Sequence, residues 1–168
     1  YDQTIVVNGV SKAYSMTGWR IGYVGGPESI IKGMKKIQSQ STSNASSMAQ
    51  AAAVAALDGD QTYIKESTGI FKERHDFVLK SLQAIDGINC LASEGTFYSF
   101  PDMNGLIEKL DGINNDIELA EFFLEKAEVA MVPGSAFGAP GCMRISFATS
   151  MENLEKSMER IKAALESN

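Results

Sequence analysis

The spacing of apolar residues changes several times along the chain, and each change predicts a new element. Residues 4–10 and 19–26 are short runs rich in β-branched and aromatic residues, which is typical of buried strands. Residues 27–40 carry large apolar residues at helical spacing, behind a proline that suits a first helical turn. A polar stretch over 40–47 interrupts this pattern, and an alanine-rich helix is then predicted to end at Asp58-Gly59.

The second half of the chain predicts one long helix followed by a mixture of strands and helices. An amphipathic pattern runs from residue 60 to about 85 and closes at Asp86-Gly87. The later predicted elements are, in chain order, a strand–turn–strand unit over 88–102, a helix over 114–129 with an Asn/Asp cap, a strand fragment over 129–133, a glycine-rich loop over 134–141, a strand over 142–149 and a closing helix capped by Thr149 or Ser150. This mixture indicates an α/β fold.

The same pattern divides the chain into three segments. Two strands cannot form a stable sheet alone, so residues 1–58 are interpreted as the end of a larger α/β domain. Residues 59–87 are interpreted as a long connecting helix, and residues 88–168 as a small α+β domain. Because the sequence opens on Tyr1 and enters an apolar strand at once, we expect it to be part of a longer protein.

Composition narrows the classes of partner. Hydrophobic residues make up 44% of the 168 residues, which indicates a folded globular protein. The net charge is −6 and no basic cluster is present, which argues against a nucleic-acid binder. No apolar run approaches the roughly 20 residues of a membrane span, so no membrane partner is expected.

Cysteine and histidine offer little chemistry in this sequence. Cys90 and Cys142 lack the CxxC spacing, and a single histidine, His75, cannot complete a metal site with them. We therefore expect no metal, and two reduced structural thiols in a cytoplasmic protein. His75 lies in the charged run KERHDF and is expected on the surface of its helix.

Lys12 is the first candidate for chemistry. It lies in the loop between the first two predicted strands, with Arg20 eight residues further on. A lysine amine attacks an aldehyde only when it is neutral, and burial or a nearby cation favours the neutral form. Lys12 is therefore a candidate Schiff-base lysine. The alternative is an ordinary lysine at a strand end that reaches into water.

Two arginines are candidates for anion binding. Arg20 follows Gly18, and an arginine offers a planar fork of donors that suits phosphate, to which the nearby hydroxyl of Ser11 could add. Arg144 lies in an apolar alternation and shares a face with Ser146, so it must either pair with a carboxylate of the protein or bind an external anion. A lysine for an aldehyde and an arginine for a phosphate describe a pyridoxal 5'-phosphate site.

These residues lie in a segment with a family resemblance. The stretch SKAYSMTGWRIGYVGGP, residues 11–27, resembles the lysine segment of class I aminotransferases, which are fold-type I enzymes dependent on pyridoxal 5'-phosphate (PLP). The downstream stretches QSTSN, EGTFYSF, VAMVPGSAFG and MRISFATSMENLEKSMERI resemble the same family, in the same order. The resemblance covers essentially the whole chain and is greatest for the bacterial aspartate aminotransferase branch.

The resemblance implies a role for each candidate. Lys12 would link to the cofactor and then move the proton at the substrate Cα, and Arg20 would bind the cofactor phosphate. Arg144 would bind the substrate α-carboxylate. Ser43 and Asn44 match a loop that approaches the site of the neighbouring subunit in a homodimer. The family commonly has a hydroxyl three residues before the lysine as a phosphate ligand; this chain has Gly9 there, and Ser11 is the substitute.

The resemblance also defines what is missing and which functions stay open. In the family, the acidic partner of the pyridine nitrogen and the ring-stacking aromatic lie upstream of the lysine, so the resemblance implies a C-terminal part of the enzyme that is inactive alone. The implied fold is the end of the large PLP-binding domain, residues 1–58, plus the small domain. The substrates would be an amino acid, aspartate or glutamate, and a 2-oxo acid. The alternatives are aromatic, alanine, kynurenine or methionine aminotransferases, or a non-catalytic binding or assembly module.

Overall fold

A computed structural model describes residues 1–167, and it divides the chain into two compact units. The first unit is Tyr1–Ser67, and the second begins at Thr68. The boundary lies inside the long helix α3, Thr62–Gln83, which was predicted over nearly the same residues.

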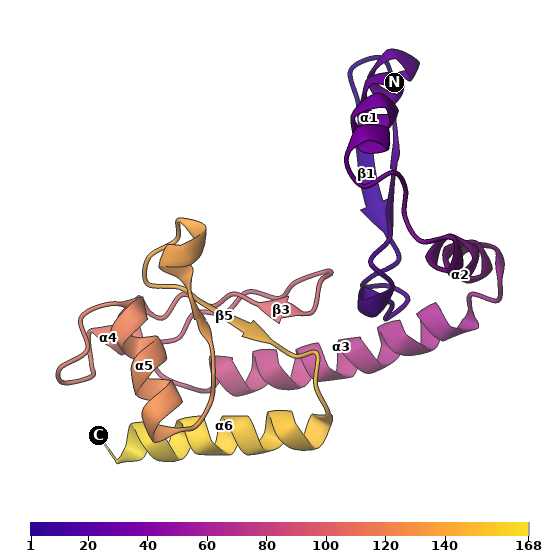
Figure 1. Ribbon diagram of the computed structural model, residues 1–168. Helices are drawn as coiled ribbons and strands as arrows, with labels where there is room; N and C mark the ends of the chain where they lie inside the picture. Colours follow the sequence, from indigo (N-terminus) through magenta and orange to yellow (C-terminus); the bar gives the residue numbers. More distant parts are fainter. Residues whose placement is uncertain (168) are drawn as a thin grey trace. The chain divides into compact units, whose positions relative to one another are not determined.

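The first unit is a two-stranded hairpin followed by two helices (Figure 1). Strands β1, Val6–Gly9, and β2, Gly22–Gly25, pair antiparallel with Gly9 opposite Gly22. A short 3-10 helix, η1, occupies Thr17–Trp19 of the connecting loop. Helices α1, Glu28–Gln40, and α2, Ser47–Asp58, confirm the two helices predicted from the apolar spacing.

The prediction that the first two strands are buried is wrong for this chain. Val6 and Val7 of β1 are 59% and 78% exposed, and α1 has no buried residue although its apolar side chains share one face. The physical reason is that this sheet consists of β1 and β2 alone, and no second layer covers its faces within residues 1–67. Val10, just after β1, is buried and anchors the loop that follows.

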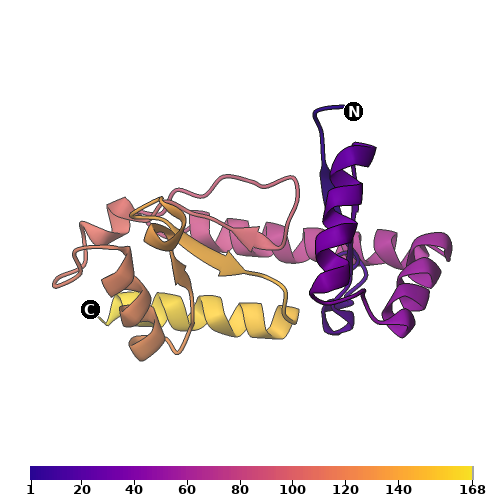
Figure 2. The ribbon, with the colours of Figure 1, turned by 45° about the horizontal axis from the view of Figure 1, so that its top comes forward.

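The second unit is a three-stranded antiparallel sheet packed on helices (Figure 2). The sheet has the order β3-β5-β4, and the helices α3 and α6 lie side by side. The elements of this unit after α3 are β3, Tyr98–Ser99; α4, Asn104–Ile107; α5, Asp116–Lys126; β4, Val132–Pro133; η2, Gly134–Phe137; β5, Met143–Ser146; and α6, Met151–Glu166.

The core of the second unit explains the orientation of β5. Met143 and Ile145 point into one contiguous apolar cluster, together with side chains of α3, α5 and α6. Because side chains alternate along a strand, Arg144 and Ser146 face away from this cluster. The shared face of Arg144 and Ser146, predicted from the sequence, is therefore confirmed.

Several boundaries differ from the sequence-based expectations. The predicted strand at the start of 88–102 is reduced to one isolated bridge, between Asn89 and Asp102, and only β3 of that unit forms. The glycine-rich loop contains η2, and the short helix α4 was not predicted. Ser150 rather than Thr149 caps α6, since its side chain accepts the Asn153 N–H.

Among residues 1–167, the structure has no helix that is both long and apolar enough to cross a membrane.

Candidate functional site

The loop between β1 and β2 contains three of the candidate residues. The pairing of Gly9 with Gly22 closes a loop that contains Ser11, Lys12 and Arg20. Tight turns fold the beginning of this loop, where the Ser15 N–H donates to the Lys12 carbonyl at 3.1 Å. Lys12 is exposed and Ser11 partly so. The hairpin thus confines an amine, a hydroxyl and a guanidinium to one loop of the first unit.

Two tyrosine contacts hold this loop against the beginning of α3. The Tyr14 hydroxyl donates to Gln61 Oε1 at 2.8 Å, and the Ser15 hydroxyl lies 2.8 Å from the Tyr63 hydroxyl. Ser15 has a φ of 54°, in the left-handed region that L-residues rarely adopt. The loop is therefore fixed by long-range hydrogen bonds as well as by the hairpin.

Arg20 has a constrained backbone and a directed side chain. It ends η1 with a φ of 51°, again in the left-handed region, and its Nη1 donates to the Thr17 carbonyl at 3.0 Å. A non-glycine residue there costs on the order of 1 kcal/mol and usually persists where the surroundings require it. Trp19, the only tryptophan of the chain, precedes it and is about half exposed.

Ser43 and Asn44 lie elsewhere in the first unit. Ser43 is exposed and has a φ of 64°. Asn44 lines a cavity of about 400 Å³ together with Ile21, Gly22 and Tyr23, the residues that follow Arg20. Asn44 therefore lies near the downstream end of the loop that contains Lys12.

Arg144 belongs to the second unit and lies against two aromatic rings. Its guanidinium carbon is 4.5 Å from the centre of the Tyr98 ring and 4.7 Å from the centre of the Phe137 ring. We call this group, Arg144 with Tyr98 and Phe137, the arginine cradle. A ring contacts the face of a guanidinium and leaves the N–H donors on its edge available for a planar anion.

Arg144 has two possible partners, a carboxylate of the protein and an external anion. Within residues 68–167, no carboxylate forms an ion pair with the Arg144 guanidinium. Arg144 is partly buried, so the arrangement favours an external anion over a structural ion pair. Sequence reasoning missed Tyr98 and Phe137. The pairing of Tyr98 with Ser146 places Tyr98 beside β5, but no spacing in the sequence indicates this pairing.

A buried acid supports one side of the cradle. Asp116, in the first turn of α5, is 1% exposed, and both of its carboxylate oxygens accept hydrogen bonds from Ser135 of η2, each at 2.7 Å. Burial alone would raise the pKa of Asp116, but the hydrogen bonds from Ser135 and from the backbone of Gly141 outweigh it and lower that pKa. Asp116 is therefore an ionised, hydrogen-bonded carboxylate inside the unit.

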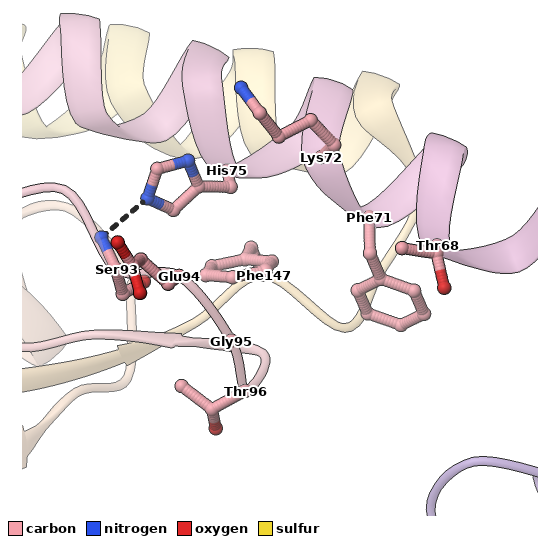
Figure 3. A pocket seen from close by; sticks show the side chains of 9 residues that line it. All are labelled: Thr68, Phe71, Lys72, His75, Ser93, Glu94, Gly95, Thr96 and Phe147. Carbon is pink, nitrogen blue, oxygen red and sulfur yellow. Dashed lines mark hydrogen bonds between the residues drawn. The ribbon is translucent and has the colours of Figure 1, made fainter.

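The expectation that His75 lies on the surface is wrong. His75 is 7% exposed, and its Nε2 accepts the Ser93 N–H at 3.1 Å (Figure 3). Its Nδ1 lies 2.9 Å from Asp76 Oδ1. Its ring also meets the ring of Phe147 edge-on, at 5.8 Å between centres. Its charged neighbours Lys72, Glu73 and Asp76 are exposed and Arg74 is partly buried. His75 instead points inward to the Ser93 loop (Figure 3).

The thiols are not candidates for nucleophilic chemistry. Cys90 and Cys142 are free, and burial raises the pKa of both, with the carboxylates of Asp102 and Asp116 adding to the rise at Cys142. A thiol with a raised pKa is a poor nucleophile at neutral pH because the thiolate is the reactive form. Among the described residues, no cluster of histidine, cysteine and acidic side chains could hold a metal ion.

Residues 1–161 match the family described as aminotransferase class I and II. The aspartate/prephenate aminotransferase of Nitrosomonas europaea is 54% identical, over 97% of this chain and 42% of that protein. The crystal structure of the aspartate aminotransferase from Rhizobium meliloti matches with a TM-score of 0.93 and 49% identity, covering 98% of this chain and 42% of that one. The aromatic aminotransferase of Pyrococcus horikoshii matches with a TM-score of 0.90 and 37% identity, covering 99% and 44%. The chain thus spans less than half the length of these relatives.

Proposed function

The chain belongs to the class I and II aminotransferases, and on that premise we propose that it is the C-terminal part of a PLP-dependent aspartate aminotransferase. The full-length protein would transfer an amino group between aspartate or glutamate and a 2-oxo acid. The fold of this chain also matches 42% of the Rhizobium meliloti aspartate aminotransferase, with a TM-score of 0.93. The single observation that carries the proposal is the hairpin-closed loop that contains Ser11, Lys12 and Arg20.

The donor set of this loop fits the cofactor. An amine suits the aldehyde of PLP, and a guanidinium with a hydroxyl suits its phosphate. When bound, PLP supplies an electron sink for the carbanion that forms at the substrate Cα. We assign the phosphate to Arg20, with Ser11 as the nearby hydroxyl, and the aldehyde to Lys12. The directed side chain and constrained backbone of Arg20 support its role, because they fix the position of the cation before an anion arrives.

Lys12 also has a catalytic role in this proposal. Its amine would take the proton from the substrate Cα as a general base and then, as the conjugate acid, deliver it to the carbon that was the PLP aldehyde. Its place in the turns after the buried Val10, in a loop held by Tyr14 and Tyr63, would limit the movement of the amine.

Arg144 is assigned to the substrate α-carboxylate. The edge of its guanidinium can donate two parallel hydrogen bonds to a carboxylate, while the Tyr98 and Phe137 rings cover its faces. Nothing within the second unit competes for the cation, since no carboxylate there pairs with it in residues 68–167. The arginine cradle would therefore recognise the group that all amino-acid and 2-oxo-acid substrates share.

One observation favours a second substrate class. Phe100 and Phe137 are 43% and 50% exposed, and their rings meet edge-on at 6.1 Å beside the arginine cradle. An exposed ring pair next to a carboxylate-binding arginine suits a substrate with an apolar or aromatic side chain. An aromatic aminotransferase is therefore the second candidate.

Assembly and location complete the proposal. We propose a cytoplasmic homodimer in which Ser43 and Asn44 lie near the site of the partner subunit. Residues 1–58 would form the C-terminal end of the large domain. Residues 59–87 would form the helix that connects it to the small domain, residues 88–168. The 168 residues alone are proposed to lack transaminase activity, because they cover only 42% of a catalytic relative.

The test is to identify the lysine that reacts with PLP. The full-length protein that contains this chain is mixed with PLP and reduced with borohydride, and the modified lysine is mapped by mass spectrometry, with Lys12→Ala as the control. Selective labelling of Lys12 and loss of aspartate-dependent transamination in the control are expected. Diffuse labelling that Lys12→Ala leaves unchanged would contradict the proposal. Relative rates with aspartate and with an aromatic amino acid separate the two substrate classes.

A further inference from the structure

We propose that Asp116 is a positioning residue for substrate binding, which acts by holding η2 so that Phe137 lies against the Arg144 guanidinium. The proposal rests on the function proposed above, in which Arg144 binds the substrate carboxylate. Asp116 touches neither substrate nor cofactor in this proposal. Its effect is on where the Phe137 ring lies, and through that ring on the direction of the Arg144 donors.

Two hydrogen bonds of Asp116 go to the turn that contains Phe137, besides the one from the backbone of Gly141. Oδ2 accepts the backbone N–H of Ser135 and Oδ1 accepts its hydroxyl, both at 2.7 Å. Ser135 and Phe137 belong to the same 3-10 turn, Gly134–Phe137, so fixing Ser135 at two atoms limits the position of Phe137. Charged acceptors in buried sites make the stronger hydrogen bonds of proteins, which suits a fixed support.

The first residue of this turn, Gly134, is held by backbone contacts. The Gly134 N–H donates to the Cys142 carbonyl at 2.7 Å, directly before β5. A Cβ at Gly134 would approach the Ala139 and Cys142 carbonyl oxygens far inside van der Waals contact, so the turn is packed against its own return segment. Gly138, with a φ of 74°, ends η2 in the left-handed region. Asp116 is thus a side chain that holds a turn whose other hydrogen bonds join backbone groups.

A purely structural role is the alternative that must be separated. An acid in the first turn of a helix stabilises the helix through its dipole, and Asp116 occupies that place in α5. However, the carboxylate bonds outward to Ser135 of η2, whereas the cap of α5 is provided by Asn115, whose Oδ1 accepts the N–H groups of Ile117 and Glu118. The two adjacent side chains therefore have separate roles: Asn115 caps α5, and Asp116 holds η2.

This division supplies a matched control. Asn115→Ala removes the cap of α5 and leaves both bonds to Ser135 in place, whereas Asp116→Ala removes these two bonds and the one from Gly141, and leaves the cap. Asp116→Asn is the conservative variant, because its amide oxygen can accept the Ser135 N–H while its NH₂ donates to the Ser135 hydroxyl, which can rotate. Ser135→Ala is milder, since it keeps the backbone N–H as a donor.

The experiment measures substrate binding and turnover in the full-length, PLP-loaded protein. Apparent KM and kcat are determined for aspartate, and the Kd of succinate, a dicarboxylate that cannot react, is determined by calorimetry. We expect Asp116→Ala to raise both KM and Kd about tenfold, with kcat within about twofold of the parent. The reason is that misdirected Arg144 donors weaken the bonds to the substrate carboxylate, while the group that moves the proton is unchanged. Asp116→Asn and Ser135→Ala should raise them by about threefold or less. Asn115→Ala should lower thermal stability without changing KM or Kd.

A double-mutant cycle tests the route through Phe137. If Asp116 acts by placing that ring, Phe137→Ala should raise the Kd for succinate as Asp116→Ala does, and the double variant should be no worse than Phe137→Ala alone. Additive effects of the two changes would overturn the proposal, as would equal shifts in Kd for Asp116→Ala and Asn115→Ala. If Asp116→Ala does not fold, Ser135→Ala takes its place in the cycle with Phe137→Ala, and the same non-additivity is expected.

Arg144→Lys separates this proposal from the proposed function. If Arg144→Lys raises the Kd for succinate and Asp116→Ala and Ser135→Ala do not, the positioning role is wrong while the carboxylate site stands. If Arg144→Lys leaves the Kd unchanged, the carboxylate site itself is wrong, and the positioning role falls with it.

Discussion

The two units differ in how far their apolar side chains are buried within the chain. In the second unit, helices and sheet enclose one contiguous apolar cluster, in which Phe123, Leu119 and Met143 are completely buried. In the first unit the buried apolar side chains are Val10, Ala49 and Ala53, while those of β1 and α1 are largely exposed. Large exposed apolar faces usually mark surfaces that another part of a protein covers.

This difference separates two kinds of candidate residue. The arginine cradle lies in the unit that has its own core, and its supports, including Asp116 and Ser135, belong to the same unit. Lys12 and Arg20 lie in the unit whose apolar faces are exposed. In the proposed function, the residue that would bind the substrate carboxylate therefore lies in the second unit, whereas the residues that would hold the cofactor lie in the first.

The largest effect is expected at Lys12, and replacing this residue tests whether catalysis depends on the first unit. In the full-length protein, Lys12→Ala should reduce kcat by about 10³-fold or more, since a positioned acid–base group alone contributes about 10² to 10⁴. The Kd of succinate should change little, because the arginine cradle that we propose for its carboxylate lies in the second unit. Steady-state kinetics and calorimetry on the same preparation check both parts. A large loss of succinate affinity would show that the two roles are not divided between the units.

The next effect tests the core directly. Phe123→Ala should lower the free energy of unfolding of the 168-residue chain by about 3–5 kcal/mol, because it removes a fully buried ring. Ile37→Ser, at a position 73% exposed in α1, should change it by about 0.5 kcal/mol or less. Urea unfolding of both variants gives the two values. Comparable losses for the two variants would contradict the contrast between the units.

The same Ile37→Ser change sharpens the comparison in the full-length protein. If residues outside this chain cover α1, the loss of stability there should exceed the loss in the 168-residue chain.

A smaller, pH-dependent effect is expected at Asp116. Its pKa is lower in the folded than in the unfolded chain, so its contribution to stability is complete above its ordinary value and is lost as pH falls through the lower folded value. The parent chain should therefore be about 1–3 kcal/mol more stable than Asp116→Asn at neutral pH, and the difference should shrink in strong acid. Urea unfolding of both chains across the acidic range tests this. A difference that grows on acidification would reverse the assigned sign.

The smallest effect is expected at surface ion pairs, and it should be equal in both units. Lys32–Glu28 in α1 and Lys156–Glu152 in α6 are exposed pairs four residues apart, with N–O distances of 2.8 and 2.6 Å. Replacing either lysine by alanine should cost about 0.5 kcal/mol or less. Thermal unfolding in low and high salt measures this. A much larger cost in one unit would show that charge, and not apolar burial, distinguishes the two.

Local signals in the sequence predicted most of the helices and the loop that contains the candidates. The cap at Asn115, the periodicity of α1 and α6, and the face shared by Arg144 and Ser146 were all confirmed, because each depends on residues a few positions apart. The exposure of β1 could not be predicted in this way. A β-branched run indicates that a strand will be covered, but not whether the covering layer belongs to the same stretch of chain.

Long-range contacts account for the rest. His75 was expected on the surface because its sequence neighbours are charged, yet its partner Ser93 is 18 residues away. The Tyr98 ring reaches Arg144 from β3 and the Phe137 ring reaches it from η2. No spacing in the sequence links the three residues. The bond from Asp116 to Ser135 spans 19 residues in the same way.

Trp19 gives the candidate cofactor loop an optical reporter of its own. It is the only indole in these 168 residues, it lies between Lys12 and Arg20 in the sequence, and it is 48% exposed. Its emission therefore reports the polarity and mobility of this one loop, with no tryptophan background from the second unit. The arrival of a light-absorbing ligand or of a covering layer of protein can be followed in this chain by fluorescence without any added label.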